Sequence, residues 1–136
     1  EDSEEYGDYL NYGWPYCYRN RGEFSADTTQ QWERKPVDCR GLPKSFAFFQ
    51  AHSAPLGLEH FGNYFLVALH GSGNVGIGNG YAIVRVSEKG KVEPFITGFL
   101  QNGKRVARPA DILRVGEDSF FFTDDFGGRI FYVYKP

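Results

Sequence analysis

Short apolar runs alternate with polar, turn-forming residues along most of the chain. The runs are rich in aromatic and β-branched side chains and are bounded by Gly, Pro and Asn, a pattern that is typical of strands. The strands that we expect are Phe46–Ala51, Leu56–Phe61, Tyr64–Leu69, Tyr81–Val86, Val92–Thr97, Ala110–Val115, Ser119–Thr123 and Arg129–Tyr134. The pattern therefore predicts an all-β fold.

The order of these runs repeats at an offset of about 55 residues. In each unit, two runs joined by a short turn are followed by a glycine-containing connection and a further run. Units of roughly 40 to 50 residues with three or four strands each are typical of β-propeller blades. The second unit has three runs and no fourth, so we expect an incomplete propeller whose partner segments lie elsewhere.

Residues 1–43 lack both helical and strand periodicity and contain the two cysteines, Cys17 and Cys39. In such a polar, loop-like segment the pair favours a disulfide, the alternative being two free thiols. We therefore expect a disulfide-pinned irregular segment over residues 1–43 and propeller blades, as one domain of a larger propeller, over residues 44–136. The acidic start without Met suggests a processed terminus or a fragment.

Composition and charge narrow the classes of function. The 15 basic and 17 acidic residues are mixed along the chain, so no basic stripe is available for a nucleic acid. No apolar run approaches the roughly 20 residues that a membrane-spanning helix needs. Together with the expected disulfide, these features indicate an extracellular or periplasmic, secreted protein.

The segment Gly71–Gly76 has the spelling of a dinucleotide-binding glycine loop. Such a loop needs a helix after it, because the helix N-terminus binds the pyrophosphate. Here the next element is the expected strand Tyr81–Val86. We therefore interpret the glycine-rich segment as a loop between strands.

The three histidines are not spaced as a helical metal pair, which argues against a zinc site. His52 and His70 stand at strand ends, where side chains can reach a binding pocket. The alternative is that each imidazole only satisfies neighbouring backbone groups. His60, next to a turn, is interpreted as structural.

Two further polar groups could bind a ligand. Asp124 and Asp125 lie in an expected turn, where they could bind a cation or, as turn acids commonly do, accept backbone N–H groups. Arg108, at the entrance of a strand, could bind a carboxylate through paired hydrogen bonds. The alternative for Arg108 is a surface ion pair with Asp111.

Six segments carry a resemblance when they are taken in order: Asn11–Tyr18, Ala51–Gly57, Val67–Ser72, Thr97–Leu100, Arg108–Asp111 and Thr123–Ile130. Together they resemble the C-terminal part of the sorbosone dehydrogenase family, which is related to the soluble glucose and pyranose dehydrogenases. The resemblance implies about two to three blades of a six-bladed β-propeller. It also implies oxidation of an aldose or pyranose with pyrroloquinoline quinone (PQQ) and calcium as cofactors.

The resemblance implies four cofactor-binding residues that face the quinone pocket: His52, His70, Asn74 and Arg108. Arg108 would bind a carboxylate of the cofactor. Gly73 and Val75 stand where the family has an aromatic residue and a cation. The resemblance also implies that the catalytic base and most calcium ligands lie in the N-terminal half of the family, so no catalytic or metal-binding residue is expected in this chain.

Two functions follow as hypotheses. In the first, the chain is the C-terminal part of a PQQ-dependent sugar dehydrogenase. It would be inactive without the N-terminal half of the same precursor, and its partners would be that half or further copies of itself, with a sugar as ligand. In the second, the chain is a non-catalytic, propeller-derived module that binds carbohydrate or protein.

Overall fold

A computed structural model describes residues 12–20, 23–26 and 38–136 of the chain. The contacts divide the chain into two compact units, Glu1–Ser45 and Phe46–Pro136. The described part of the chain contains strands and turns and no helix, which confirms the all-β prediction. It accordingly contains no helix that is long and apolar enough to cross a membrane.

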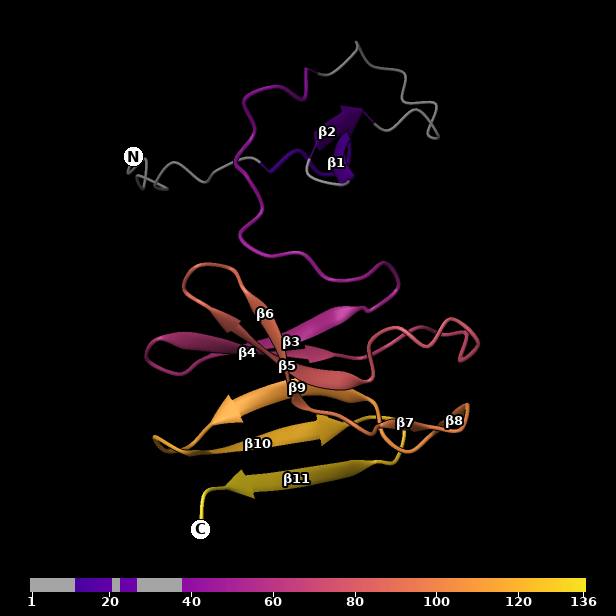
Figure 1. Cartoon of the computed structure of the whole chain (residues 1–136), viewed down its shortest axis with the longest axis vertical. Coiled ribbons are helices and arrows are strands. Elements are labelled where there is room, and N and C mark those ends of the chain that lie inside the picture. Colours follow the sequence, from indigo (N-terminus) through magenta and orange to yellow (C-terminus); the bar gives the residue numbers. More distant parts are fainter. Residues whose placement is uncertain (1–11, 21–22, 27–37) are drawn as a thin grey trace, which may run out of the picture. The chain divides into compact units, whose positions relative to one another are not determined.

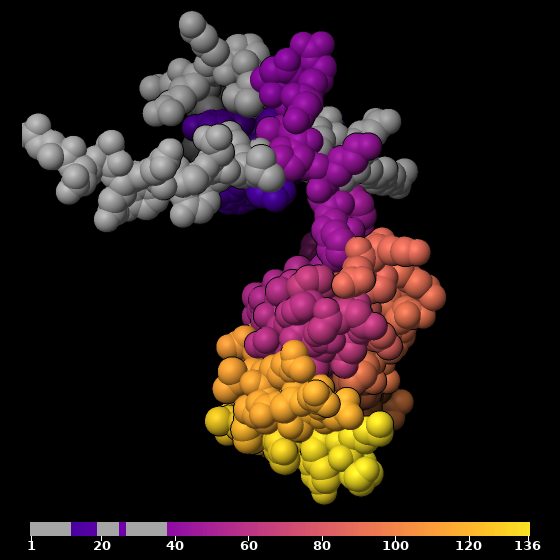
Figure 2. Space-filling model, turned by 90° about the vertical axis from the view of Figure 1, so that its left-hand side faces the viewer, coloured from indigo at the N-terminus to yellow at the C-terminus, as the bar shows by residue number. Residues whose placement is uncertain are grey.

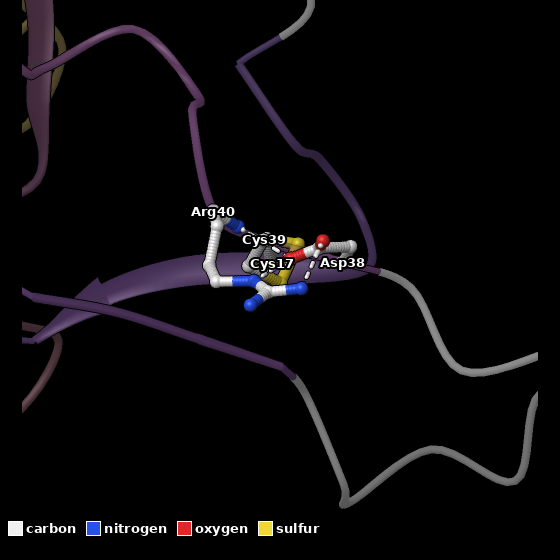
Figure 3. Close-up of a disulfide and its surroundings, with 4 residues drawn as sticks. All are labelled: Cys17, Asp38, Cys39 and Arg40. Atoms are coloured by element: carbon white, nitrogen blue, oxygen red, sulfur yellow. Dashed lines mark hydrogen bonds and ion pairs between the residues drawn. A yellow bond between two sulfur atoms is a disulfide. The ribbon is translucent and has the colours of Figure 1, made fainter.

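The first unit contains an antiparallel hairpin of β1 (Cys17–Asn20) and β2 (Glu23–Ala26). The predicted disulfide is present and joins Cys17 to Cys39, with the two Cα atoms 5.8 Å apart. Figure 3 shows Asp38 and Arg40 on either side of Cys39, joined by an ion pair of 2.8 Å. The prediction of a wholly irregular segment was therefore wrong over the hairpin; most of the polar stretch 25–35 lies outside the described residues.

The second unit contains two larger antiparallel sheets (Figure 1). Four strands form the first sheet in chain order: β3 (Pro55–His60), β4 (Tyr64–Leu69), β5 (Ala82–Ser87) and β6 (Val92–Ile96). Three strands form the second sheet, also in chain order: β9 (Pro109–Arg114), β10 (Ser119–Asp124) and β11 (Arg129–Tyr134). A short hairpin of β7 (Leu100–Gln101) and β8 (Lys104–Arg105) lies between them in the chain.

The two sheets pack on each other through β9, which contacts β3 and β4. Strand alternation sends one set of apolar side chains from each sheet into this interface. The buried residues of this core are Phe61, Leu66, Ala68, Ile83, Ile112, Phe120 and Phe122. The rings of Phe61 and Phe120, one from each sheet, meet edge to face at 5.7 Å. The number of propeller blades stays a prediction.

Residues 46–51 do not form the predicted strand. Ala47 and Phe49 instead pack on the opposite face of the first sheet, against a second apolar cluster of Val67, Leu69, Val84 and Val86. The alternating pattern was real, because alternate residues face the sheet. The segment has no ladder partner, however, and a period of two does not tell a paired strand from a segment that covers a sheet.

Candidate functional site

The connections that carry most of the predicted site residues lie at one end of the two sheets. In Figure 1 the connection between β4 and β5, the β7–β8 hairpin and the β10–β11 turn all lie on the same side. This arrangement follows from the topology, because the second strand of each antiparallel sheet runs toward this end. Side chains that are far apart in the sequence are thereby brought together.

The clearest product of this arrangement is a pair between His70 and Asp125. The His70 Nε2 atom lies 2.8 and 2.9 Å from the two carboxylate oxygens of Asp125. The imidazole is 14% exposed and the carboxylate 56% exposed. A carboxylate accepts hydrogen bonds, so Nε2 carries the proton and Nδ1 is the acceptor nitrogen of the neutral ring.

Each member of this pair directly follows the second strand of its sheet, His70 after β4 and Asp125 after β10. The separation of 55 residues equals the offset of the repeat. The pair is thus formed by equivalent positions of two neighbouring sheets.

Arg108 lies beside the pair and binds the backbone that leads away from His70. Its Nε donates to the His70 carbonyl at 3.2 Å and its Nη2 to the Gly71 carbonyl at 2.8 Å. The guanidinium carbon lies 6.0 Å from the centre of the Tyr81 ring. No ion pair with Asp111 is formed within the described part of the chain. Arg108 therefore fixes the loop after β4.

Asp124 is the residue before Asp125, and its side chain is buried and hydrogen-bonded within the fold. Its side chain has no exposed surface, accepts the Arg108 amide at 2.8 Å and pairs with the Arg129 guanidinium at 2.6 Å. Burial alone would raise the pKa of this carboxyl. The hydrogen bonds from Arg108, Arg129 and the Gly127 amide lower it more, so the pKa of Asp124 lies below its ordinary value of 3.8.

The loop between β4 and β5 is fixed at several points. The Tyr81 hydroxyl donates to the Ser72 carbonyl, and Asn79 Nδ2 donates to the Ala51 carbonyl at 2.8 Å. Asn74, a predicted site residue, uses its Oδ1 atom to accept the Gly76 amide at 2.9 Å. The side-chain oxygen of Asn74 therefore already has a hydrogen-bond partner within the loop.

His52 lies in the connection before β3, and the structure brings this connection alongside His70. The amides of His70 and Gly71 donate to the carbonyls of Ala54 and Ser53, at 3.0 and 2.8 Å. The His52 side chain itself is exposed. It therefore borders the end of the sheets where the His70–Asp125 pair lies.

Backbone strain is concentrated in the same place. His52, Ala54 and Tyr81 have positive φ angles of 66°, 49° and 54°. Packing is also tight: a Cβ atom on Gly80 would lie 2.5 Å from the Gly71 Cα. Strained backbone conformations persist only where their surroundings enforce them, and they cluster at binding and active sites.

No metal site is seen among the described residues. They include no group of three or more His, Cys, Asp and Glu side chains that could hold a metal, and Asp124 is already taken by Arg129 and backbone amides. A calcium ion binds six to eight oxygen ligands. The cation binding considered for Asp124 and Asp125 is thus not supported at this turn.

The sequence did not lead us to predict the contact between Asp125 and His70. It also did not lead us to single out Tyr81 or Arg105 as candidate site residues. The repeat could have pointed to Asp125, because the 55-residue offset aligns Asp125 in the second repeat with His70 in the first. No local pattern marks Tyr81, whose role depends on the ring lying against the Gly71 backbone.

Comparison with known proteins gives no match to a family profile. An uncharacterized protein of Borreliella burgdorferi is 31% identical over 141 aligned positions, which cover 91% of this chain and 36% of that protein. Two solved structures of a Trichoderma reesei Carbohydrate-Active Enzymes Family AA12 protein, a calcium structure and an iodide structure, have TM-scores of 0.71 and 0.70. Each is 20% identical to this chain, and each match covers 93% of this chain and 39% of the solved chain.

At this identity the solved structures show the fold, and the chain spans little more than a third of the proteins that it matches. The assignment to the C-terminal part of the sorbosone dehydrogenase family was wrong, because the matching structures belong to family AA12 and no family profile matches. The motifs misled the assignment for a physical reason: their Gly and Asp residues are required by the packing and hydrogen bonding of the fold. Gly71 lies against the Tyr81 ring and Asp124 accepts backbone amides. Such motifs indicate a fold more than a family.

Proposed function

We propose that this chain is a segment of a β-propeller of the carbohydrate-oxidising kind, and that the His70 end of its two sheets forms one wall of a sugar site. The observation that carries the proposal is the His70–Asp125 pair. It gives an imidazole with a fixed orientation and an acceptor nitrogen, which is what removing a proton from a sugar hydroxyl requires. The fold likeness to a carbohydrate-active enzyme supports a sugar as the ligand.

Each residue has a distinct part in this proposal. Asp125 holds Nε2–H of His70, so that Nδ1 accepts the hydroxyl proton and Asp125 stabilises the imidazolium that forms. Arg108 and Tyr81 keep the loop after His70 in place and so fix the imidazole. Asn74 and His52 border the site and offer hydrogen-bonding groups for further sugar hydroxyls.

Oxidation also needs a hydride acceptor, and the basic character of this end suits a carboxylated quinone such as PQQ. Arg108 uses Nε and Nη2 on backbone carbonyls, which leaves Nη1 to bind a cofactor carboxylate. PQQ would supply the redox chemistry when bound. The proposal assigns no calcium ligands to this chain, because the described ranges hold no group of three or more His, Cys, Asp and Glu side chains.

The remaining wall of the site would come from partner segments, either the N-terminal half of the same precursor or further copies of the chain. The outer face of the second sheet supports this proposal because it is apolar and open. Its exposed side chains include Leu113, Phe121, Ile130, Tyr132 and Tyr134. The disulfide supports a secreted, extracellular or periplasmic location.

The proposal can be tested by NMR on the three histidines of the chain. The ring ¹⁵N shifts should show His70 protonated at Nε2, and adding D-glucose should move the His70 signals with saturation. His60 is the internal control, since it packs on the Phe65 ring, 4.9 Å away, at the opposite end of β3. The variant Asp125→Asn should change the His70 tautomer and weaken the glucose response. Protonation at Nδ1, or equal shifts at His60, would overturn the proposal.

A second function is favoured by the same open face. A non-catalytic module that binds carbohydrate or protein would use Tyr132, Tyr134 and Phe121, whose rings lie 4.9 to 5.4 Å apart in a row. In that case ligand binding would survive replacement of His70 and be lost with Tyr132→Ala. Replacing His70 and replacing Tyr132 therefore distinguish the two functions.

A further inference from the structure

The two-residue turn of the β7–β8 hairpin is an Asn–Gly step. The ladder pairs Gln101 with Lys104, so Asn102 and Gly103 form the turn. Their φ angles are 50° and 71°. Positive φ angles at both positions are typical of a type I′ turn, for which Asn–Gly is the favoured sequence. The local sequence and the observed turn therefore agree.

An Asn–Gly step is also the place where an amide side chain reacts most readily with its own main chain. The Gly nitrogen attacks Asn Cγ and forms a C–N bond that closes a five-membered succinimide ring, and the side-chain nitrogen leaves as ammonia. Water then opens the ring at one of its two carbonyls and gives aspartate or isoaspartate. No oxidant is needed, because nothing is oxidised or reduced. Glycine favours ring closure because it has no Cβ atom to obstruct its nitrogen or restrict its backbone.

The surroundings of Asn102 and Gly103 leave this reaction open. Both residues are exposed, and a Cβ atom on Gly103 would have no neighbour within 4 Å. Neither the Asn102 side chain nor the Gly103 amide has a hydrogen-bond partner within the described part of the chain. The hairpin has two ladder pairs and belongs to neither of the larger sheets. Two strands alone are marginally stable at best, so the turn can open and let the Gly103 nitrogen reach Asn102 Cγ.

A second Asn–Gly step, Asn79 and Gly80, is held in place. Asn79 Nδ2 donates to the Ala51 carbonyl at 2.8 Å, and the Asn79 carbonyl accepts the Ser72 amide at 3.1 Å. A Cβ atom on Gly80 would lie 2.5 Å from the Gly71 Cα, so the backbone is closely packed here. Ring closure requires the side chain and the backbone of the Asn to rotate. The structure therefore gives the same dipeptide two different reactivities.

We propose that Asn102 is a self-modification site, at which the folded chain loses ammonia and gains a carboxylate while Asn79 stays intact. The inference goes beyond the proposed function and does not depend on it. The new charge lies beside β8, whose two residues are both cations. Where the ring opens to isoaspartate, the main chain also gains a methylene group, which the type I′ turn does not accommodate.

The modification should reach the loop that follows His70. Arg105, in β8, donates from Nη2 to the Gly73 carbonyl, so a loosened hairpin weakens a contact of this loop. We expect the Gly73 amide signal in NMR spectra to shift in the isoaspartate form. The shift should be smaller in Asn102→Asp, which has the new charge and an ordinary main chain. Equal shifts in the two forms would contradict the loosening.

The test incubates the 136-residue chain at mildly alkaline pH, folded or in urea, and analyses its tryptic peptides by mass spectrometry. Trypsin places Asn102 in the peptide Val92–Lys104 and Asn79 in Ser45–Arg85, and fragment ions locate the modified residue. In the folded chain, Asn79 should convert about tenfold more slowly than Asn102 or slower still, because two hydrogen bonds must break first. In urea the two residues should convert at similar rates.

The matched control is Asn102→Gly, because Gly–Gly keeps the type I′ turn and removes the reacting amide. Its peptide 92–104 should stay unmodified, and modification there would place the reaction at another residue. Equal rates at Asn102 and Asn79 in the folded chain would overturn the inference. So would an Asn102 that stays intact in the folded chain while the urea sample converts.

Discussion

Asp124 and Asp125 are neighbours in the sequence, yet their environments give them different roles. Asp124 is enclosed and pairs with Arg129, whereas Asp125 is 56% exposed and holds His70. The difference follows from strand alternation at the end of β10, which turns one side chain inward and the next outward. At this scale, burial separates a structural acid from one that can take part in chemistry.

The low pKa of Asp124 predicts a specific dependence of stability on pH. Its folded-state pKa lies below the ordinary value of 3.8, so the carboxylate stabilises the fold above that value. The contribution is lost as the pH falls from 3.8 through the folded-state pKa. Urea unfolding between pH 6 and pH 2 should therefore show a steep loss of stability in that acid range.

The variant Asp124→Asn should be less stable at pH 7 by about 2 kcal/mol or more, because it breaks charged hydrogen bonds to Arg129. Its stability should then change less with pH in the acid range. Asp118→Asn is the matched control, since Asp118 is exposed and 3.8 Å from Lys135. An acid transition of unchanged steepness in Asp124→Asn would contradict the assignment.

At the scale of elements, the packing of β3 on β9 depends on a glycine. A Cβ atom on Gly57 would lie 2.6 Å from the Asp111 Cα and 2.9 Å from the Ala110 carbonyl oxygen. Both obstacles are backbone, which a side-chain rotation does not relieve. The close approach of the two sheets thus requires a residue without a side chain at this position.

Gly57→Ala should therefore push the sheets apart and lower the free energy of unfolding by about 1–3 kcal/mol. Thermal or urea unfolding of the purified variant measures this loss. Gly73→Ala serves as the control because the added methyl group meets open space there. If Gly57→Ala proved as stable as the wild type, the two sheets would not be packed as described.

Much of the strand arrangement could be predicted from the sequence, because period-two patterns between turns are local signals. The bounds of β4 and β11 were predicted without error, and those of β9 and β10 within one residue. The hairpins β1–β2 and β7–β8 were missed, since their strands are too short to show a period. Residues 46–51 carried the right pattern but lacked a partner strand.

The candidate site was less predictable than the strands. His70 and Arg108 were singled out as polar residues at strand ends, and Arg108 Nε donates to the His70 carbonyl in the structure; their part in a site stays a prediction. The contacts of Asp125 with His70 and of Arg105 with Gly73 were not predicted, because they form between the two sheets and between two loops. Contacts of this kind leave no local pattern.

At the scale of the whole molecule, the outer face of the second sheet is the main unpartnered surface of the Phe46–Pro136 unit. An open depression of about 340 Å³ on it is lined mostly by apolar residues, among them Leu113, Phe121 and Ile130, together with Asp111 and Thr123. Figure 2 shows the yellow atoms of β11 at the surface of this unit. An exposed apolar sheet face with a free strand edge favours association.

We therefore expect native mass spectrometry to find the chain in species heavier than 15.4 kDa. Charges on the open face should oppose association, so the double variant Leu113→Lys, Ile130→Lys should shift the protein to a folded monomer. Glu88→Lys, in the exposed turn between β5 and β6, is the control for added positive charge. A folded wild-type monomer at low micromolar concentration would contradict this prediction.

The two repeats differ in the connection after their second strand, which spans residues 70–81 in the first repeat and residues 125–128 in the second. Both connections join equivalent strands, so the same sheet geometry tolerates a long or a short segment there. Only the long one carries the glycine-rich stretch beside Arg105. Under the proposed function, insertion or deletion at this point, over evolution or by loop grafting, would alter ligand preference while the sheets beneath stay the same.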